Sequence, residues 1–303
     1  MKNFNLIKNR NYFLGFSIFM VLLSIVLVAT LGLRQGIDLR GGTQWQVLFT
    51  SGTVTDEMVR KAIAPITKEG EGSVKQSGAS ANSFILRLPN LDEARHLEYS
   101  AALKTIGDFK EENFSSIGPT IGIELRNRAI KAIIAVLFGI SLYIAYAFRK
   151  VSKPISSWKY GFATLITLLH DVVIPTGLLA FLGWYKGIEI DTNFIVALLV
   201  VMGFSVHDTI VVFDRIRENI LIHRGKNLTL AEIINYSVRE TFARSVNTTL
   251  TLVIMLVALL VVGPSSLFYF ILTILVGTVF GTYSSIFLAS PILYLWGRGN
   301  SQS

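Results

Sequence analysis

Two neighbouring side chains, His170 and Asp171, lie inside a long apolar stretch that is expected to cross a membrane. Asp171 falls near the middle of this stretch, where an ionised carboxylate costs about 2.5–3.5 kcal/mol on insertion scales. Low-dielectric surroundings favour the neutral acid, so this group can exchange protons near neutral pH. Two interpretations are open: Asp171 binds a proton or cation in a transport path, or it holds two helices together. A threonine would serve the second role at lower cost, which favours the first, and Thr164 and Thr167 lie on the face from which they could hydrogen-bond Asp171.

A second carboxylate, Asp208, lies in the next apolar stretch, about one turn from the middle, and directly follows His207. A packing role and a role in the ion path are equally open for Asp208. Arg215 and Arg217 come about two turns later. They are either anchors at the membrane surface or long side chains that reach inward to pair with a buried carboxylate.

The His-Asp pair occurs twice, which could indicate a metal site, but the spacing of the two residues within each pair argues against one. Neighbouring residues on a helix point about 100° apart, whereas helical metal ligands usually lie four residues apart. The chain has no cysteine, so thiolate catalysis and thiolate metal sites are excluded. It also has no nucleophile elbow, Walker loop or dinucleotide fingerprint. We therefore predict no enzyme activity, no catalytic residue, no metal and no organic cofactor.

These residues belong to a chain of 303 residues, of which 51% are hydrophobic and 16% are charged. Residues 11–33 and 245–297 contain no charge. Since about 20 helical residues cross a hydrocarbon core, the chain is not a purely soluble enzyme or a disordered protein. The pair Gly263-Pro264 ends one helix and so divides the second run. The pattern predicts a polytopic α-helical membrane protein with six transmembrane helices, at 12–33, 129–148, 161–184, 192–213, 246–262 and 267–295.

Lysine and arginine concentrate on one side of this arrangement. They lie in the tails 1–11 and 296–303 and in the loops Arg149–Lys159 and 214–245, whereas the opposite short loops contain only Lys186. By the positive-inside rule both termini are expected in the cytoplasm. Segment 34–128 is then extracytoplasmic and has equal numbers of basic and acidic residues. The formal charge of +8 therefore reflects membrane orientation, and no nucleic acid binding is predicted.

The segment between the first two membrane helices is long enough for one small folded domain. Residues Trp45–Phe49 and Phe84–Leu88 alternate in the manner of half-buried strands, and a weaker strand is expected near Phe114–Ile117. One helix is expected to start near Thr55, and a second at a capping box that opens at Asn90. This order predicts a small α+β domain of ferredoxin-like type. The residues expected on the buried helix faces are Met58, Ala62, Ile63 and Ile66 in the first helix and Ala94, Leu97 and Ala101 in the second.

Two further patterns concern the last three spans. Thr229 and Glu232 match a capping box, so Leu230–Thr241 is expected to form a short amphipathic helix on the membrane surface. The last span has small residues at a four-residue interval, which lets another helix approach closely. These residues are Gly277, Gly281, Ser285 and Ala289.

Four motifs resemble those of a known family. In chain order they are GIDLRGG at 36–42, SIGPTIGIEL at 116–125, LHDV at 169–172 and GFSVHDTIVVFDRIREN at 203–219. The motif residues that we single out are Gly36, Asp38, Gly41, Gly42, Gly118, Pro119, Glu124, His170, Gly203 and Asp214. Over nearly its whole length the chain resembles the SecF family, the smaller membrane subunits of the bacterial SecDF protein-export accessory complex, in the RND transporter superfamily. It departs from the family at His207, where asparagine is usual, and at Phe204, where tyrosine is frequent.

The resemblance implies a multi-pass protein of the bacterial inner or plasma membrane that pairs with SecD and associates with the SecYEG channel. SecA and YajC are further expected partners, together with exported preproteins and membrane lipids. The family is thought to use the proton or sodium gradient to assist export, so the only expected cofactor is the coupling ion. On this hypothesis Asp171 matches the ion-coupling carboxylate, Asp208 lies in the same path, and Arg215 or Arg217 is the basic partner. Two alternatives stay open: an ion-driven RND-type exporter of small molecules or lipids, and a scaffold subunit that transduces no energy.

Overall fold

The computed structural model describes residues 5–67, 72–76, 82–149, 155–224 and 227–298. It divides into two compact units, one of residues 1–34 and 131–303 and the other of residues 35–130. The ends of both expected tails, and parts of the expected loops at 150–154 and 225–226, lie outside the described residues.

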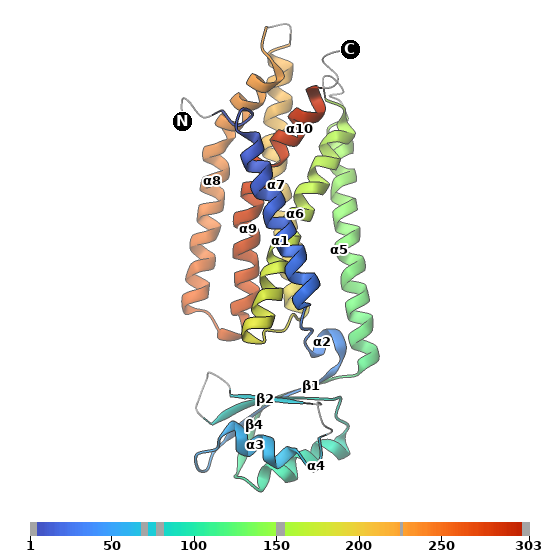
Figure 1. Cartoon of the computed structure of the whole chain (residues 1–303), viewed down its shortest axis with the longest axis vertical. Coiled ribbons are helices and arrows are strands. Elements are labelled where there is room, and N and C mark those ends of the chain that lie inside the picture. Colours follow the sequence, from blue (N-terminus) through green and yellow to red (C-terminus); the bar gives the residue numbers. More distant parts are fainter. Residues whose placement is uncertain (1–4, 68–71, 77–81, 150–154, 225–226, 299–303) are drawn as a thin grey trace. The chain divides into compact units, whose positions relative to one another are not determined.

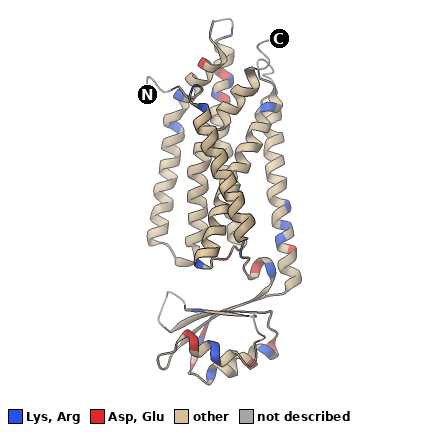
Figure 2. Cartoon of the chain, viewed as in Figure 1, with Lys and Arg blue, Asp and Glu red and all other residues tan. Residues whose placement is uncertain are grey.

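Six helices in the described part of the chain are long and apolar enough to cross a membrane (Figure 1). This confirms the predicted polytopic helical architecture. Most charged residues of these helices lie toward the helix ends, and the middle of the bundle consists mainly of uncharged residues (Figure 2). The first five helices are α1 (Arg10–Leu31), α5 (Pro119–Ala147), α6 (Ser157–Lys186), α7 (Thr192–Ile222) and α8 (Leu230–Val262), and the sixth consists of the 3-10 turn η1 (Ser265–Leu267), α9 (Phe268–Phe287) and α10 (Ala289–Arg298).

The largest difference from the sequence prediction is α8, which is one helix of 33 residues. A separate surface helix at Leu230–Thr241 was expected from the capping box of Thr229 and Glu232. Backbone hydrogen bonding does not depend on side-chain polarity, and no glycine or proline interrupts the helix. The prediction of a separate surface helix is therefore wrong.

The start of α8 does agree with the prediction. The hydroxyl of Thr229 accepts the backbone N–H of Glu232 at 3.3 Å, and the Glu232 carboxylate accepts the N–H of Thr229 at 2.8 Å. Because α7 also continues to Ile222, the predicted loop 214–245 shortens to a connection between Ile222 and Leu230.

The sixth membrane helix is broken where the sequence predicts a continuous span. α9 ends at Phe287, and α10 begins at Ala289. Pro291 has no N–H and cannot bond the carbonyl four residues earlier, which belongs to Phe287. The missing bond gives a physical reason for the break.

The unit of residues 35–130 is built on a four-stranded antiparallel sheet with the strand order β2-β3-β1-β4, and two helices lie on one face of the sheet (Figure 1). The chain order βαββαβ with this strand order is the ferredoxin-like topology expected from the sequence. The elements are α2 (Ile37–Arg40), β1 (Gly42–Phe49), α3 (Asp56–Ile63), β2 (Ser73–Gln76), β3 (Ser83–Leu88), α4 (Glu93–Lys104) and β4 (Phe109–Ile117).

The two central strands have the alternation that their sequences predict. Trp45 pairs with Leu86 and Val47 pairs with Phe84, and all four side chains are fully buried. The predicted final strand near Phe114 is real but begins earlier, at the start of β4. The core of this unit therefore lies between the sheet and its two helices.

The faces that the two helices bury differ from the prediction. α3 begins at the expected Thr55 cap but buries Val59 and Ile63, and Met58 is 40% exposed. α4 is capped by Asp92, whose carboxylate accepts the N–H of Arg95 at 2.9 Å, and not by a box that opens at Asn90. With this later start, α4 buries Tyr99 and Leu103, and the expected stripe of Ala94, Leu97 and Ala101 is exposed.

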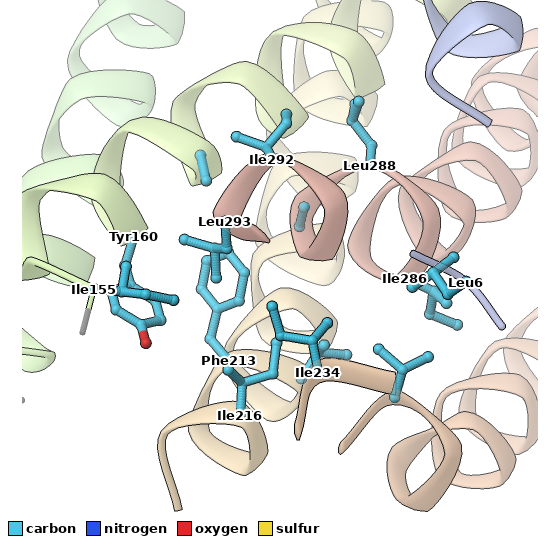
Figure 3. Close-up of a cluster of buried hydrophobic side chains, with 14 of the residues drawn as sticks. Leu6, Ile155, Tyr160, Phe213, Ile216, Ile234, Ile286, Leu288, Ile292 and Leu293 are labelled. Carbon is cyan, nitrogen blue, oxygen red and sulfur yellow. The ribbon is translucent and has the colours of Figure 1, made fainter. Parts of the chain in front are cut away.

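A cluster of buried apolar side chains packs one end of the membrane bundle (Figure 3). It joins Leu6, which precedes α1, to Tyr160 of α6, Phe213 of α7, Ile234 of α8 and Leu293 of α10. Each of these side chains is at most 1% exposed. The cluster fixes the ends of four membrane helices and thereby the positions of the polar residues further inside.

Candidate functional site

Two carboxylates are buried at the middle of adjacent helices. Asp171 is the fifteenth of the 30 residues of α6 and is fully buried. Asp208 is the seventeenth of the 31 residues of α7 and is 7% exposed. Because α7 continues past the predicted end of its span, Asp208 lies nearer the helix midpoint than the sequence suggested.

Donors from three helices hold the Asp171 carboxylate. Its Oδ1 lies 2.8 Å from Nδ1 of His170, the preceding residue of α6. Its Oδ2 accepts the hydroxyl of Ser284 in α9 at 2.8 Å and also the hydroxyl of Ser205 in α7. Hydrogen bonds to charged groups contribute about 1.5–3 kcal/mol each, so these partners offset much of the cost of burying a carboxylate.

The Asp208 carboxylate has a similar environment. Its Oδ1 accepts the hydroxyl of Ser245 in α8 at 2.5 Å, and its Oδ2 accepts the hydroxyl of Ser285 in α9. The two sets of hydrogen bonds are joined through the backbone of α9, because Ser284 and Ser285 are consecutive residues, and together they are called the network below. Its bonds between α6, α7, α8 and α9 all run from a serine hydroxyl to a carboxylate.

The backbone of α6 is weakened at its carboxylate. Pro175 lies within the helix, four residues after Asp171. Since proline has no N–H, the backbone carbonyl of Asp171 lacks its usual intrahelical donor. The helix is therefore easier to bend at this residue than elsewhere along its length.

The small-residue stripe of the last span explains how α9 comes close enough to reach both acids. A Cβ placed on Gly277 would collide with the side chain of Val201 in α7. A Cβ on Gly281 would lie 3.0 Å from the Cβ of Ser205. Ser285 continues the stripe and donates to Asp208, and Ala289, the last of the stripe, is fully buried at the start of α10.

Among the described residues, neither Arg215 nor Arg217 bonds Asp171. Arg215 instead makes two bonds of 2.6 Å to Glu240 and one of 2.6 Å to Glu218. Asp171 meets α7 at Ser205, ten residues before Arg215, and this spacing is about 15 Å along the helix axis, beyond the reach of an arginine side chain.

The pair that Arg215 forms with Glu240 ties α7 to α8 before the charge-free run of α8 begins. Arg217 lies 3.4 Å from Asp214 and over the ring of Phe148, so it also has partners other than the buried acids.

Several other polar atoms near Asp171 and Asp208 make no bond to either carboxylate in the described structure. Thr164 and Thr167, which were expected to reach Asp171, each donate at 2.9 Å to a carbonyl of their own helix. His207 is exposed. His170 Nε2 is buried and has no hydrogen-bond partner within the described structure. Nor does any group of three or more His, Asp or Glu residues that could hold a metal occur among the described residues.

The first two sequence motifs meet within the unit of residues 35–130. Gly41 has φ +82°, and a Cβ on it would lie 2.5 Å from the Cα of Pro119, the first residue of α5. A Cβ on Gly122 would collide with the backbone of Gly41. The glycines are therefore required by backbone conformation and close approach.

The remaining motif residues have more ordinary positions. Gly36 precedes α2, Asp38 lies in its first turn, and Gly42 opens β1 with φ +131°. Glu124 forms an exposed ion pair of 2.6 Å with Arg128. A Cβ on Gly118 or Gly203 would meet no atom within 4 Å, so neither glycine is required by a close contact.

Comparison with protein families agrees with this arrangement. Residues 98–299 match the C-terminal domain of the SecD/SecF protein export membrane proteins, and residues 26–52 match the SecD/SecF GG motif. The chain belongs to the SecD/SecF family. The resemblance inferred from the four motifs is thereby confirmed, and the SecD/SecF GG motif contains the close-packed pair Gly41 and Gly42.

Individual members of the SecD/SecF family match almost the whole chain. The chain is 41% identical to protein translocase subunit SecF of Thermobaculum terrenum, over 96% of this chain and 93% of that protein. It is 38% identical to SecF of Sebaldella termitidis, over 97% and 92% of the two proteins. A crystal structure of SecDF from Thermus thermophilus, described as a translocon-associated membrane protein, is 32% identical and has a TM-score of 0.82 over 97% of this chain and 39% of that one. The chain is therefore a multi-pass membrane protein of the SecD/SecF protein-export family.

Sequence reasoning missed the hydroxyl groups that hold the two acids. Ser284 was not singled out, and Ser285 was interpreted only as a small packing residue. Serines in apolar helices commonly bond their own backbone, so residue type alone does not reveal a partner on another helix. The one available signal is the pair of consecutive serines inside a charge-free run.

Proposed function

We propose that this chain is a SecF-like accessory subunit of the Sec protein translocase that uses the transmembrane proton or sodium gradient to assist export of preproteins. The observation that carries the proposal is Asp171, a fully buried carboxylate at the middle of α6 with donors from three helices. Acidic residues that face the interior of a membrane bundle typically mark ion pathways. Asp208 supplies a second carboxylate of the same kind in the adjacent helix.

The energy released when one coupling ion crosses the membrane is similar to the energy of one hydrogen bond to the Asp171 carboxylate. One elementary charge that moves through 100 mV releases about 2.3 kcal/mol. A hydrogen bond to a charged group contributes about 1.5–3 kcal/mol, so one transfer offsets about one of the bonds to Asp171. Binding of the ion neutralises the carboxylate, the hydroxyls of Ser205 and Ser284 lose a charged acceptor, and α6, α7 and α9 repack.

Membership in the SecD/SecF family indicates which partners and which membrane to expect for this subunit. The part of Thermus thermophilus SecDF that this chain matches is 39% of that chain, and we expect a separate SecD subunit to supply the remainder. The pair would associate with the SecYEG channel, with SecA and YajC nearby, and would act on preproteins at the outer face. On the basis of the family, we expect the subunit to lie in the bacterial cell membrane. The distribution of lysine and arginine supports an orientation in that membrane with both termini in the cytoplasm.

The test is an export assay in a strain depleted of the native subunit, with a secreted reporter. Asp171→Asn keeps the shape of the side chain and removes its ability to ionise, so we expect normal membrane insertion and loss of export stimulation. Asp56→Asn, an exposed acid in α3, is the matched control and should retain stimulation. Normal secretion by Asp171→Asn would reject energy coupling through this acid.

The same assay separates the alternatives. A scaffold subunit predicts that Asp171→Asn complements fully and that only deletion of the chain reduces secretion. An exporter of small molecules or lipids predicts normal reporter secretion together with loss of efflux. Either outcome would contradict the proposed function.

A further inference from the structure

The four serines that hold Asp171 and Asp208 are of two kinds. Ser205 and Ser245 donate only to a carboxylate in the described structure. Ser284 and Ser285 each have a second acceptor as well, in the backbone of α9. This difference separates hydroxyls with one available partner from hydroxyls with two.

The second acceptors are close and well placed. The hydroxyl of Ser284 lies 3.0 Å from the carbonyl oxygen of Gly281 and 2.8 Å from Asp171. The hydroxyl of Ser285 lies 2.9 Å from the carbonyl oxygen of Thr282 and also bonds Asp208. A serine hydroxyl has one proton and cannot donate fully to both acceptors, so each side chain has two hydrogen-bonded states that differ by a rotation about the C–O bond.

The charge of the carboxylate decides between these states. An ionised carboxylate only accepts, so the serine proton points toward it. A protonated carboxyl group can donate its own proton to the serine oxygen, and the serine proton then turns to the carbonyl of α9. No heavy atom has to move for this exchange, and every group remains hydrogen-bonded.

Because Ser284 and Ser285 are consecutive residues of one helix, the two exchanges involve the same turn of α9. The exchange at Ser284 changes the hydrogen bonding of the Gly281 carbonyl, and the exchange at Ser285 changes that of the Thr282 carbonyl, so each exchange alters the polarisation of the turn that the other one uses. Titrating groups that interact in this way take up protons as a pair and not independently.

Other charged or titratable groups do not provide this link. Within one turn of the network these are His170, His207, Arg244 and Tyr283. His170 bonds Asp171 and lies beside the rings of Phe280 and Tyr283, and the side chains of His207 and Arg244 are exposed. The hydroxyl of Tyr283 donates to the carbonyl of Phe13 in α1 at 2.9 Å.

We propose that Ser284 and Ser285 are positioning residues that couple the protonation of Asp171 to that of Asp208 by exchanging each hydroxyl between a carboxylate and the α9 backbone. The inference rests on the proposed function for its meaning in export, since there the two acids exchange the coupling ion. The coupling itself is a property of the purified chain and can be measured without any export.

The experiment is infrared spectroscopy of the full-length protein in lipid nanodiscs during a pH titration. Asp171→Asn and Asp208→Asn assign the band of each protonated carboxyl group. We expect Asp171→Asn to move the titration midpoint of the Asp208 band by about one pH unit or more, as interacting sites do. With Ser284→Ala or Ser285→Ala in the background, that effect should fall below half of its original size.

Three further variants exclude a merely structural explanation. Ser284→Thr keeps the hydroxyl and should restore the coupling. Ser290→Ala removes a hydroxyl that is fully buried and has no partner in the described structure, and it should leave the coupling unchanged. If Ser284→Ala does not fold, Ser284→Cys replaces it, because a thiol of similar size is a weak donor and should also reduce the coupling.

Unchanged coupling in the variants at positions 284 and 285 would overturn the inference, and so would an equal loss in Ser290→Ala. These results are independent of the export assay. Normal export by Asp171→Asn would reject the proposed function while the spectroscopic coupling could still be present. Loss of export by that variant, with spectra insensitive to both serines, would reject only the inference.

Discussion

Replacing Ser205 by alanine removes one of the three partners of the Asp171 carboxylate, and it removes no other hydrogen bond of that hydroxyl. The side chain is fully buried, so water does not replace the lost donor. A hydrogen bond to a charged group contributes about 1.5–3 kcal/mol. In a double-mutant cycle of Ser205→Ala with Asp171→Asn, the asparagine oxygen still accepts a neutral hydrogen bond of about 0.5–1.5 kcal/mol, so we expect a coupling energy of about 1–1.5 kcal/mol, or roughly 5- to 13-fold in the unfolding equilibrium.

The assay is reversible unfolding of the purified protein in mixed micelles, followed by circular dichroism, for the native chain, both single variants and the double variant. The matched control is Ser290→Ala, because that hydroxyl is equally buried and has no hydrogen-bond partner among the described residues. Its effect should add to that of Asp171→Asn within about 0.5 kcal/mol. An additive result for Ser205 as well would refute the argument that its hydroxyl stabilises the buried charge.

Two other predictions use glycines as probes of close packing. Gly277→Ala places a methyl group against the side chain of Val201 and should lower the free energy of unfolding by about 1–3 kcal/mol, whereas Gly203→Ala has open space and should stabilise α7 by up to about 1 kcal/mol. Thermal unfolding measures both, and similar shifts for the two variants would contradict the packing of α9 on α7. Gly41→Ala and Gly52→Ala both force an alanine into positive φ, at +82° and +76°, which costs about 1–2 kcal/mol, but only Gly41 also meets backbone. Hydrogen exchange of strand β1 should therefore increase more in Gly41→Ala, and an equal increase in both would show that the backbone contact adds nothing.

The parts of this protein that were predictable from sequence rest on strong local signals. Six apolar stretches, two alternating strands and a capping box each predict an element without knowledge of its neighbours. The charges of Asp171 and Asp208 are conspicuous because an acid inside an apolar stretch is costly. These signals were sufficient for the membrane architecture, the ferredoxin-like order of the small domain and the two acids.

The parts that were not predictable depend on partners distant in sequence. From the sequence, Arg215 is a reasonable partner for a buried acid, but in the structure it pairs with Glu240. Leu97 of α4 is exposed because the helix packs with Tyr99 and Leu103 toward the core, and apolar spacing alone does not reveal which face packs inward. The roles of Ser284 and Ser285 depend on which helices pack against α9. The presence of a serine in the sequence does not reveal which neighbouring helix supplies its acceptor.

The uninterrupted course of α8 has a mechanical consequence. Ser245 and Leu230 belong to the same helix and are separated by about 22 Å at the usual rise per residue. A helix without a hinge moves as a rigid rod, so a tilt that begins at Ser245, beside the Asp208 carboxylate, also moves the capped end at Thr229. The buried acid is thereby connected mechanically to the end of α8 that lies outside the bundle interior.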